Sequence, residues 1–263
     1  METVKRLLYK LYGEETGRLA LKRLAPMIEK FSVIPGAKKG FFSQEDVVLI
    51  TYGDSLQRAG QAPIATLHEF AVNYLQDTIS AIHFLPFFPY SSDDGFSVID
   101  FFAINPQLGA WEDVNAIRND FELMFDFVVN HFSSRSQWFA DYLADEPGYE
   151  DFAIDVDPST DLSMVTRPRS LPLLSEYTKH DGRKVNLWTT FSADQIDFNF
   201  RSLNVLTKMV EVLLFYVHNG AMLLRQDAVA YLWKEIGTTC IHLEQTHDMV
   251  KLFRAILDIV APD

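Results

Sequence analysis

The chain alternates short apolar runs with longer segments in which apolar residues recur at helical spacing. Four of the short runs are bounded by polar residues or by proline, which is typical of buried strands. They cover residues 47–52, 79–85, 123–129 and 221–224. Strands that alternate with helical segments predict a parallel sheet with both faces covered. The pattern therefore predicts an α/β fold built on four buried parallel strands.

Three other segments place apolar residues three and four positions apart, as amphipathic helices do. Residues 2–31 combine seven such apolar positions with interspersed charges and predict a helical N-terminal extension. A second helix is predicted from Val205 to Val217, and Asn219-Gly220 would end it. A third helical pattern leads up to Val260.

The interval 132–201 breaks this alternation because turn signals such as Pro147-Gly148 and Asp181-Gly182 are frequent in it. We interpret it as a subdomain inserted after the third strand. The resulting division comprises an N-terminal extension (1–42), a first part of the main domain (43–131), the insertion (132–201) and the continuation of the main domain (202–263).

Unusual polar residues follow the predicted strands at their carboxyl ends. These residues are Tyr52 and Asp54, Asp93 and Asp94, then Asp126, Asn130 and His131, and finally Arg225 and Asp227. In a parallel barrel the side chains that carry the chemistry gather at this rim. We therefore expect the four strand ends to converge on one site.

Arg225 and Asp227 lie two residues apart, so their side chains point to the same face of a strand. The guanidinium should keep the carboxylate ionised by lowering its pKa, as a nucleophile requires. Two simpler interpretations stay open: Asp227 is a helix N-cap or surface acid, or the pair only braces the end of the strand.

His131 leaves a buried run together with Asn130, which favours contact with a ligand over a role in the core. We expect its imidazole to donate to a sugar hydroxyl and Asp93 to accept from others. Most aromatic residues around the second loop are expected in the core, but Phe96 and Tyr231 could supply an apolar platform for a sugar ring. Metal binding is not expected, because no second histidine lies at a suitable spacing. Arg169 suits bidentate binding of a phosphate or carboxylate, although its alternative is a solvated or ion-paired arginine.

Composition limits the classes of function. The formal net charge is −13 and the pI about 4.9, which argues against nucleic acid as a partner, because nucleic-acid binders need a basic face. Cys240 is the single cysteine, so no intrachain disulfide can form, and a reducing cytoplasm is expected. The N-terminus lacks the apolar core of a signal peptide, and no segment approaches the roughly 20 apolar residues of a membrane span.

Two short motifs connect these residues to a known family. Residues 126–131 match an Asp-x-x-x-Asn-His motif, and residues 225–228 match an Arg-x-Asp-Ala motif. Both resemble the retaining α-glucan-active enzymes of glycoside hydrolase family 13. The longer tracts at 85–100, 167–169 and 188–192 resemble its sucrose phosphorylase-like subfamily, and most of all glucosylglycerate phosphorylases, with sucrose 6-phosphate phosphorylases close behind.

This resemblance implies the N-terminal half of a (β/α)8 TIM barrel, with an inserted B domain after its third strand. It implies that Asp227 is the nucleophile and Arg225 its partner, and that Asp93 and His131 contact the glucosyl ring. It further places Phe96 and Tyr231 at the apolar faces of the ring and Arg169 near the phosphate or acceptor site. The substrates would be a small glucoside and inorganic phosphate, and no cofactor would be needed.

Gln226 departs from the family's usual leucine between the arginine and the aspartate. Its side chain should point away from the face that carries Arg225 and Asp227, so we expect it to affect packing rather than chemistry. A polar group there could be costly if it lacks a hydrogen-bond partner.

Three functions remain open at this point. They are a phosphorylase, a hydrolase or transglucosidase of the α-amylase type, and a non-catalytic sugar-binding remnant. The sequence also leaves open the oligomeric state and the acceptor, which could be glycerate, fructose or fructose 6-phosphate.

The resemblance implies that the second catalytic carboxyl group comes from a strand after Asp227. None of the later acids, such as Glu235, Glu244 or Asp258, ends a predicted buried strand. We therefore expect residues 1–263 alone to lack phosphorylase activity, because a retaining mechanism needs both carboxyl groups. A phosphorolysis assay on the purified chain measures this, and turnover that Asp227→Asn abolishes would contradict it.

Overall fold

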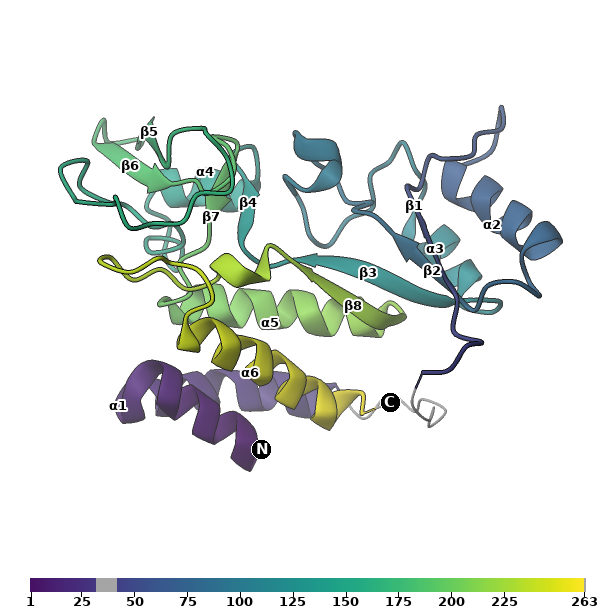
Figure 1. The fold of residues 1–263 in the computed structure, drawn as a ribbon, viewed down its shortest axis with the longest axis horizontal. Helices are drawn as coiled ribbons and strands as arrows, with labels where there is room; N and C mark the ends of the chain where they lie inside the picture. The colour runs from purple at the N-terminus through teal and green to yellow at the C-terminus, as the bar shows by residue number, and fades with distance from the viewer. Residues whose placement is uncertain (32–41, 263) are drawn as a thin grey trace. The chain divides into compact units, whose positions relative to one another are not determined.

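The computed structural model describes residues 1–31 and 42–262. The predicted end of the N-terminal extension, residues 32–41, lies outside this part. The chain forms two compact units (Figure 1). The sheet unit comprises Ala37–Val128 and Leu214–Asp227, and the terminal unit comprises Met1–Gly36, Val129–Leu213 and Ala228–Asp263. Each unit is described by itself.

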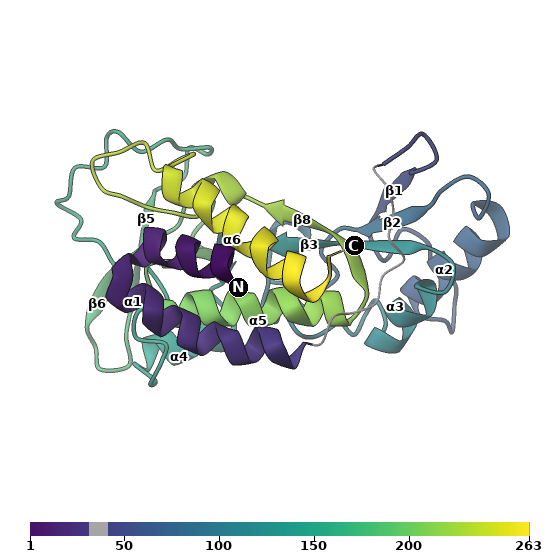
Figure 2. The same ribbon diagram turned by 90° about the horizontal axis from the view of Figure 1, so that it is seen from below.

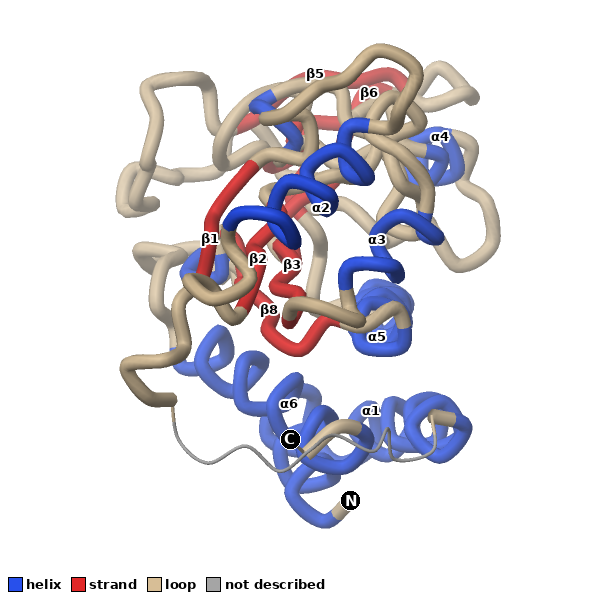
Figure 3. Tube along the Cα trace, turned by 90° about the vertical axis from the view of Figure 1, so that its right-hand side faces the viewer, coloured by secondary structure: helices blue, strands red, loops and turns tan. Residues whose placement is uncertain are grey.

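The sheet unit contains the four predicted strands. They are β1 (Val48–Thr51), β2 (Ala81–Phe84), β3 (Glu122–Val128) and β8 (Ala221–Asp227), all parallel and in the order β1-β2-β3-β8. Helices α2 (Pro63–Tyr74) and α3 (Trp111–Ile117) connect successive strands and lie on one side of the sheet (Figure 3). The predicted α/β fold with a four-stranded parallel sheet is confirmed.

The prediction that all four strands are buried is wrong for the two at the edges of the sheet. Both inner strands are largely buried, and every residue of β2 is. In β1, by contrast, Ile50 is 61% exposed, and in β8 Met222 is 44% exposed. An edge strand has a neighbouring strand on one side only, so its apolar side chains receive less cover than those of an inner strand. An apolar run does not distinguish the two positions.

The two faces of the sheet have different chemistry. In the register of the sheet, His83 pairs with Met124, and Asp126 pairs with Arg225. Residues paired in this way, and those two positions further along, share a face, so His83, Asp126, Arg225 and Asp227 lie on the same face. The opposite face carries Phe84, Phe125, Phe127 and Gln226, and its aromatic rings pack with Phe87 and Tyr216.

The terminal unit is built around helix contacts and two small antiparallel sheets. α1 (Glu2–Lys30), interrupted at Gly13 where φ is 78°, lies beside α6 (Glu244–Val260) (Figures 1 and 2). Lys10 on α1 pairs with the buried Asp248 on α6 at 2.6 Å. The helical expectations for residues 2–31 and for the segment ending at Val260 are confirmed.

β4 (His131–Ser133) begins one residue before the predicted insertion, which contains α4 (Gln137–Leu143), β5 (Leu174–Thr178), β6 (Lys184–Trp188) and β7 (Gln195–Asp197). β4 pairs with β7, and β5 pairs with β6, both antiparallel. α5 (Leu203–His218) follows where a helix was predicted. The domain boundaries at 131 and 201 stay predictions. Within the described residues, no helix is both long and apolar enough to cross a membrane.

Gln226 provides a test of the apolar face. Its Oε1 atom is buried, and no hydrogen-bond partner lies within reach among the described residues. Gln226→Leu should therefore raise the free energy of unfolding by about 1–2 kcal/mol, because it removes an unpaired buried acceptor. Chemical denaturation followed by circular dichroism measures the change. Gln226→Glu, which adds a charge at the same place, should lower stability, and a destabilised leucine variant would show that the amide is bonded after all.

Candidate active site

The polar face of the sheet unit carries a continuous line of charged and hydrogen-bonding groups. His83 Nε2 lies 2.9 Å from Asp126 Oδ2, and Arg225 donates to Asp126 Oδ1. The same guanidinium reaches Asp227, with Nη2 3.0 Å from Oδ1. From β2 to β3 the line rises two residues, because His83 is in register with Met124; it then crosses level from Asp126 to Arg225 on β8 and rises two more residues along β8 to Asp227. It therefore ends at the carboxyl edge of the sheet, at Asp227.

The predicted pairing of Arg225 with Asp227 is confirmed, but the predicted direction of the pKa shift is wrong. Burial raises the pKa of Asp227 above its ordinary value, and the Arg225 guanidinium offsets only part of this effect. The nearby carboxylates of Asp126 and Asp93 shift the pKa of Asp227 upwards as well. Spacing along a strand reveals the neighbouring cation, but it does not reveal the loss of solvent.

The loop after β2 adds Asp93 and Phe96 to the sheet unit. Asp93–Gly95 forms a short 3-10 turn in which φ is +56° at Asp93, +49° at Asp94 and +106° at Gly95. A Cβ at Gly95 would lie 2.8 Å from the Pro86 carbonyl oxygen, so only glycine fits there. The two left-handed aspartates are strained, as residues at functional sites often are. The turn brings the Phe96 ring against the Arg225 side chain. The guanidinium carbon of Arg225 lies 5.5 Å from the centroid of this ring.

His131 lies in the terminal unit, where it is buried within a polar network. Its Nε2 is 3.1 Å from Gln195 Nε2, and its ring packs 5.3 Å from that of Phe191. Its neighbour Asn130 donates to Asp197 Oδ2 at 2.9 Å and accepts from Lys234 Nζ at 2.7 Å. Lys234 also pairs with Asp197 at 2.6 Å, and burial lowers the pKa of this lysine although Asp197 opposes the shift.

Phe191 connects the two remaining predicted residues of the terminal unit. The ring of Tyr231 meets that of Phe191 edge-on at 5.5 Å, and the guanidinium of Arg169 lies 5.9 Å from the same ring. Arg169 is exposed, as is Arg167 two residues earlier. Phe191 therefore gathers His131, Arg169 and Tyr231 around one aromatic ring.

The structure thus brings the seven predicted residues together in two groups. Asp93, Phe96, Arg225 and Asp227 share the sheet unit, and His131, Arg169 and Tyr231 share the terminal unit. Sequence reasoning missed His83, Lys234 and Asp197. His83 is the one strongly polar side chain inside the apolar run of β2, which was a usable signal. Nothing in the sequence around Lys234 marks that lysine as buried.

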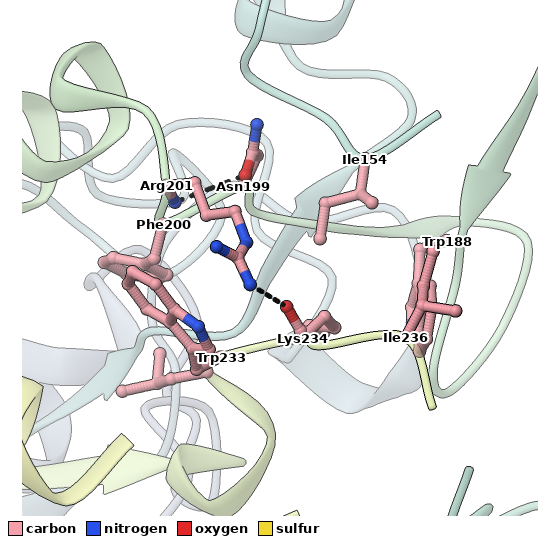
Figure 4. Close-up of a pocket in the computed structure, with 9 residues that line it drawn as sticks. Ile154, Trp188, Asn199, Phe200, Arg201, Trp233, Lys234 and Ile236 are labelled. Carbon is pink, nitrogen blue, oxygen red and sulfur yellow. Dashed lines mark hydrogen bonds between the residues drawn. The ribbon is translucent and has the colours of Figure 1, made fainter. Parts of the chain in front are cut away.

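A pocket of about 170 Å³ in the terminal unit holds none of the predicted residues (Figure 4). Its walls are mainly apolar and include Trp188, Trp233 and Ile236. Arg201 spans it, since its guanidinium lies 5.0 Å from the Trp233 ring and donates to the Lys234 carbonyl oxygen at 3.2 Å. The pocket thus lies against the main chain of Lys234, whose side chain belongs to the network of Asn130 and Asp197.

Comparison with known proteins agrees with the motifs at the strand ends. Residues 70–257 match the family model for the alpha amylase catalytic domain. The chain is 49% identical to the glucosylglycerate phosphorylase of Spirochaeta thermophila over 269 aligned residues, covering all of this chain and 46% of that protein. It is also 49% identical to the glucosylglycerate phosphorylase of Escherichia coli K12, covering 96% of this chain and 45% of that protein. The chain therefore spans about half the length of the curated relatives it matches.

Solved structures give the same result. The crystal structure of sucrose 6F-phosphate phosphorylase from Thermoanaerobacter thermosaccharolyticum matches 84% of this chain and 48% of its own, with a TM-score of 0.76 and 29% identity. A trehalose-6-phosphate hydrolase from Bacillus licheniformis, 17% identical with a TM-score of 0.69, shares the fold alone. With the family model covering well over half of its residues, the chain belongs to the alpha-amylase family, glycoside hydrolase family 13, and its relatives include the glucosylglycerate phosphorylases.

Proposed function

We propose that the protein is a retaining α-glucosyl phosphorylase, which uses phosphate to cleave a glucoside and releases α-glucose 1-phosphate. The observation that carries the proposal is the Asp227–Arg225–Asp126 arrangement at the carboxyl edge of the sheet, in a chain 49% identical to glucosylglycerate phosphorylases. The glucoside would be glucosylglycerate, sucrose or a sucrose phosphate, since phosphorylases named for these substrates are among the relatives.

Asp227 is the nucleophile in this proposal. Its carboxylate attacks the anomeric carbon, and a β-glucosyl enzyme forms. The bond to the acceptor oxygen breaks as the second catalytic carboxyl group, which the family resemblance places on a later strand, protonates that oxygen. Phosphate then displaces the carboxylate from the same carbon, so that two inversions give net retention. Arg225 fixes the orientation of the attacking carboxylate. Asp126 is unsuited to protonating the leaving oxygen, because one of its oxygens is bonded to Arg225 and the other to His83.

The remaining predicted residues supply contacts with the substrates. In the sheet unit, Asp93 accepts hydrogen bonds from glucosyl hydroxyls and Phe96 offers an aromatic face to a sugar. In the terminal unit, His131 donates to a sugar hydroxyl and Tyr231 offers an aromatic face. Arg169 binds phosphate, for which an exposed guanidinium anchored against Phe191 is suited.

We also propose that the parallel sheet is the N-terminal half of a (β/α)8 barrel and that residues 132–201 form its inserted B domain. The strand order β1-β2-β3-β8 supports this interpretation. The segment between β3 and β8 is much longer than the connections between β1, β2 and β3, and it carries the two antiparallel sheets.

Because residues 1–263 alone are expected to lack the second catalytic carboxyl group, the proposed function is tested on the full-length protein. The assay supplies each glucoside in turn, with and without phosphate. Phosphate-dependent release of glucose 1-phosphate is expected. Asp227→Asn should lower kcat at least about 10³-fold, because an amide cannot act as the nucleophile. Release of free glucose with no preference for phosphate would instead identify a hydrolase, and transfer to other sugars a transglucosidase.

The raised pKa of Asp227 predicts the acid limb of the pH profile. Asp227 attacks only when ionised, so kcat/KM should fall as the pH drops through a pKa above the ordinary value of about 3.9. Arg225→Met should move this limb to higher pH, since the guanidinium lowers the pKa of Asp227. A pH–rate profile measures both effects. Arg58→Met breaks the exposed pair with Glu69 in the same unit and should leave the limb unchanged, whereas a limb that Arg225→Met does not move would contradict the assignment.

Arg169 and Arg167 form a matched pair for testing the phosphate contact. Arg169→Ala should raise the KM for phosphate about ten- to hundredfold, the loss expected for a hydrogen bond between charged groups. Arg167→Ala, which removes an equally exposed charge two residues away, should change it little. Initial rates measured against phosphate concentration give both values, and equal effects of the two variants would show a general charge effect rather than a binding site.

A further inference from the structure

His83 is the buried first residue in a series of side-chain contacts that runs through Asp126 and Arg225 to Asp227. It lies on β2, is 3% exposed, and is surrounded in the sequence by the apolar residues Ala81, Ile82 and Phe84. A histidine imposes a desolvation cost at such a position unless its ring nitrogens are bonded. Its Nε2 is bonded, because it lies 2.9 Å from Asp126 Oδ2.

Asp126 transmits this contact toward the nucleophile. Its carboxylate is fully buried, so each oxygen needs a donor. His83 serves Oδ2, and Arg225 serves Oδ1. The orientation of the carboxylate, and with it the place of Arg225, therefore depends on donors from both sides.

The guanidinium of Arg225 in turn contacts two carboxylates. One of its nitrogens bonds Asp126, and another lies 3.0 Å from Asp227 Oδ1. A guanidinium is planar and rigid. A tilt of the Asp126 carboxylate would therefore shift the Arg225 guanidinium as one body and change its contact with Asp227 as well. A change at His83 would thus reach Asp227, although no contact joins the two residues directly.

We propose that His83 is a positioning residue for the nucleophile, acting through Asp126 and Arg225 to hold the Asp227 carboxylate in the orientation for attack. The proposal rests on the proposed function, because it assumes that Asp227 attacks the substrate. It assigns His83 no contact with the substrate. Loss of His83 should therefore slow the chemical step more than it weakens binding.

The experiment uses the whole protein and compares four variants by the kcat and KM of phosphorolysis. His83→Leu removes the donor and should lower kcat about ten- to hundredfold, with KM changed less than about threefold. His83→Gln can place an amide N–H near the position of Nε2 and should recover most of the lost kcat. His83→Asn is too short to reach Asp126 and should behave like His83→Leu.

His68 provides the matched control within the same unit. Its Nε2 lies 2.8 Å from Asp120 Oδ2, so it too contacts an aspartate, and this contact leads away from Asp126, Arg225 and Asp227. His68→Leu should leave both kcat and KM unchanged. Melting curves of all variants separate loss of fold from loss of orientation. If His83→Leu does not fold, the comparison of the glutamine and asparagine variants decides.

Two results would overturn the proposal. One is an unchanged kcat in His83→Leu or His83→Asn. The other is an equally low kcat in the glutamine and asparagine variants at equal melting temperature, which would mean that the ring only fills space. Failure of the proposed function is recognised separately, since the unmutated protein would then release no glucose 1-phosphate, or Asp227→Asn would keep the unmutated kcat.

Discussion

The buried carboxylate of Asp126 is the group on which the rest of the sheet unit's polar face depends. It has no exposure to solvent, and a bare carboxylate in such a place would be protonated or would destabilise the fold. Hydrogen bonds from His83 on β2 and Arg225 on β8 compensate for this burial, so β2, β3 and β8 are joined by side chains as well as by the backbone. Asp126 therefore fixes Arg225, and Arg225 fixes Asp227.

The same burial sets the chemical character of Asp227. Loss of solvent raises the pKa of this carboxyl, whereas Arg225 lowers it, and the result lies above the ordinary value. Because Arg225 also serves Asp126, it is only partly available to offset the burial of Asp227. In the proposed mechanism, burial thus makes the ionisation of Asp227 somewhat harder and its attack easier, because a less solvated carboxylate is a more reactive nucleophile.

The sequence predicts the elements better than it predicts their surroundings. Apolar runs and helical spacing located the four strands and the helices at Leu203–His218 and Glu244–Val260, because these patterns are local. The exposure of Ile50, the net pKa shift of Asp227 and the buried state of Lys234 depend on what packs against each residue. Lys234 bonds Asn130 from 104 positions away, and His83 bonds Asp126 from 43. Periodicity carries no information on such pairs, whereas the Arg225–Asp227 contact was predictable from a spacing of two.

Each face of the sheet carries a feature that lowers the stability of the fold. On the apolar face, the unpaired oxygen of Gln226 serves no contact among the described residues. On the polar face, Asp93 and Asp94 adopt left-handed backbone angles in the turn that brings Phe96 to the Arg225 guanidinium. Each of these features costs of order 1–3 kcal/mol. Only the strained turn is connected to the candidate site. It places the Phe96 ring against the Arg225 guanidinium, which contacts Asp227.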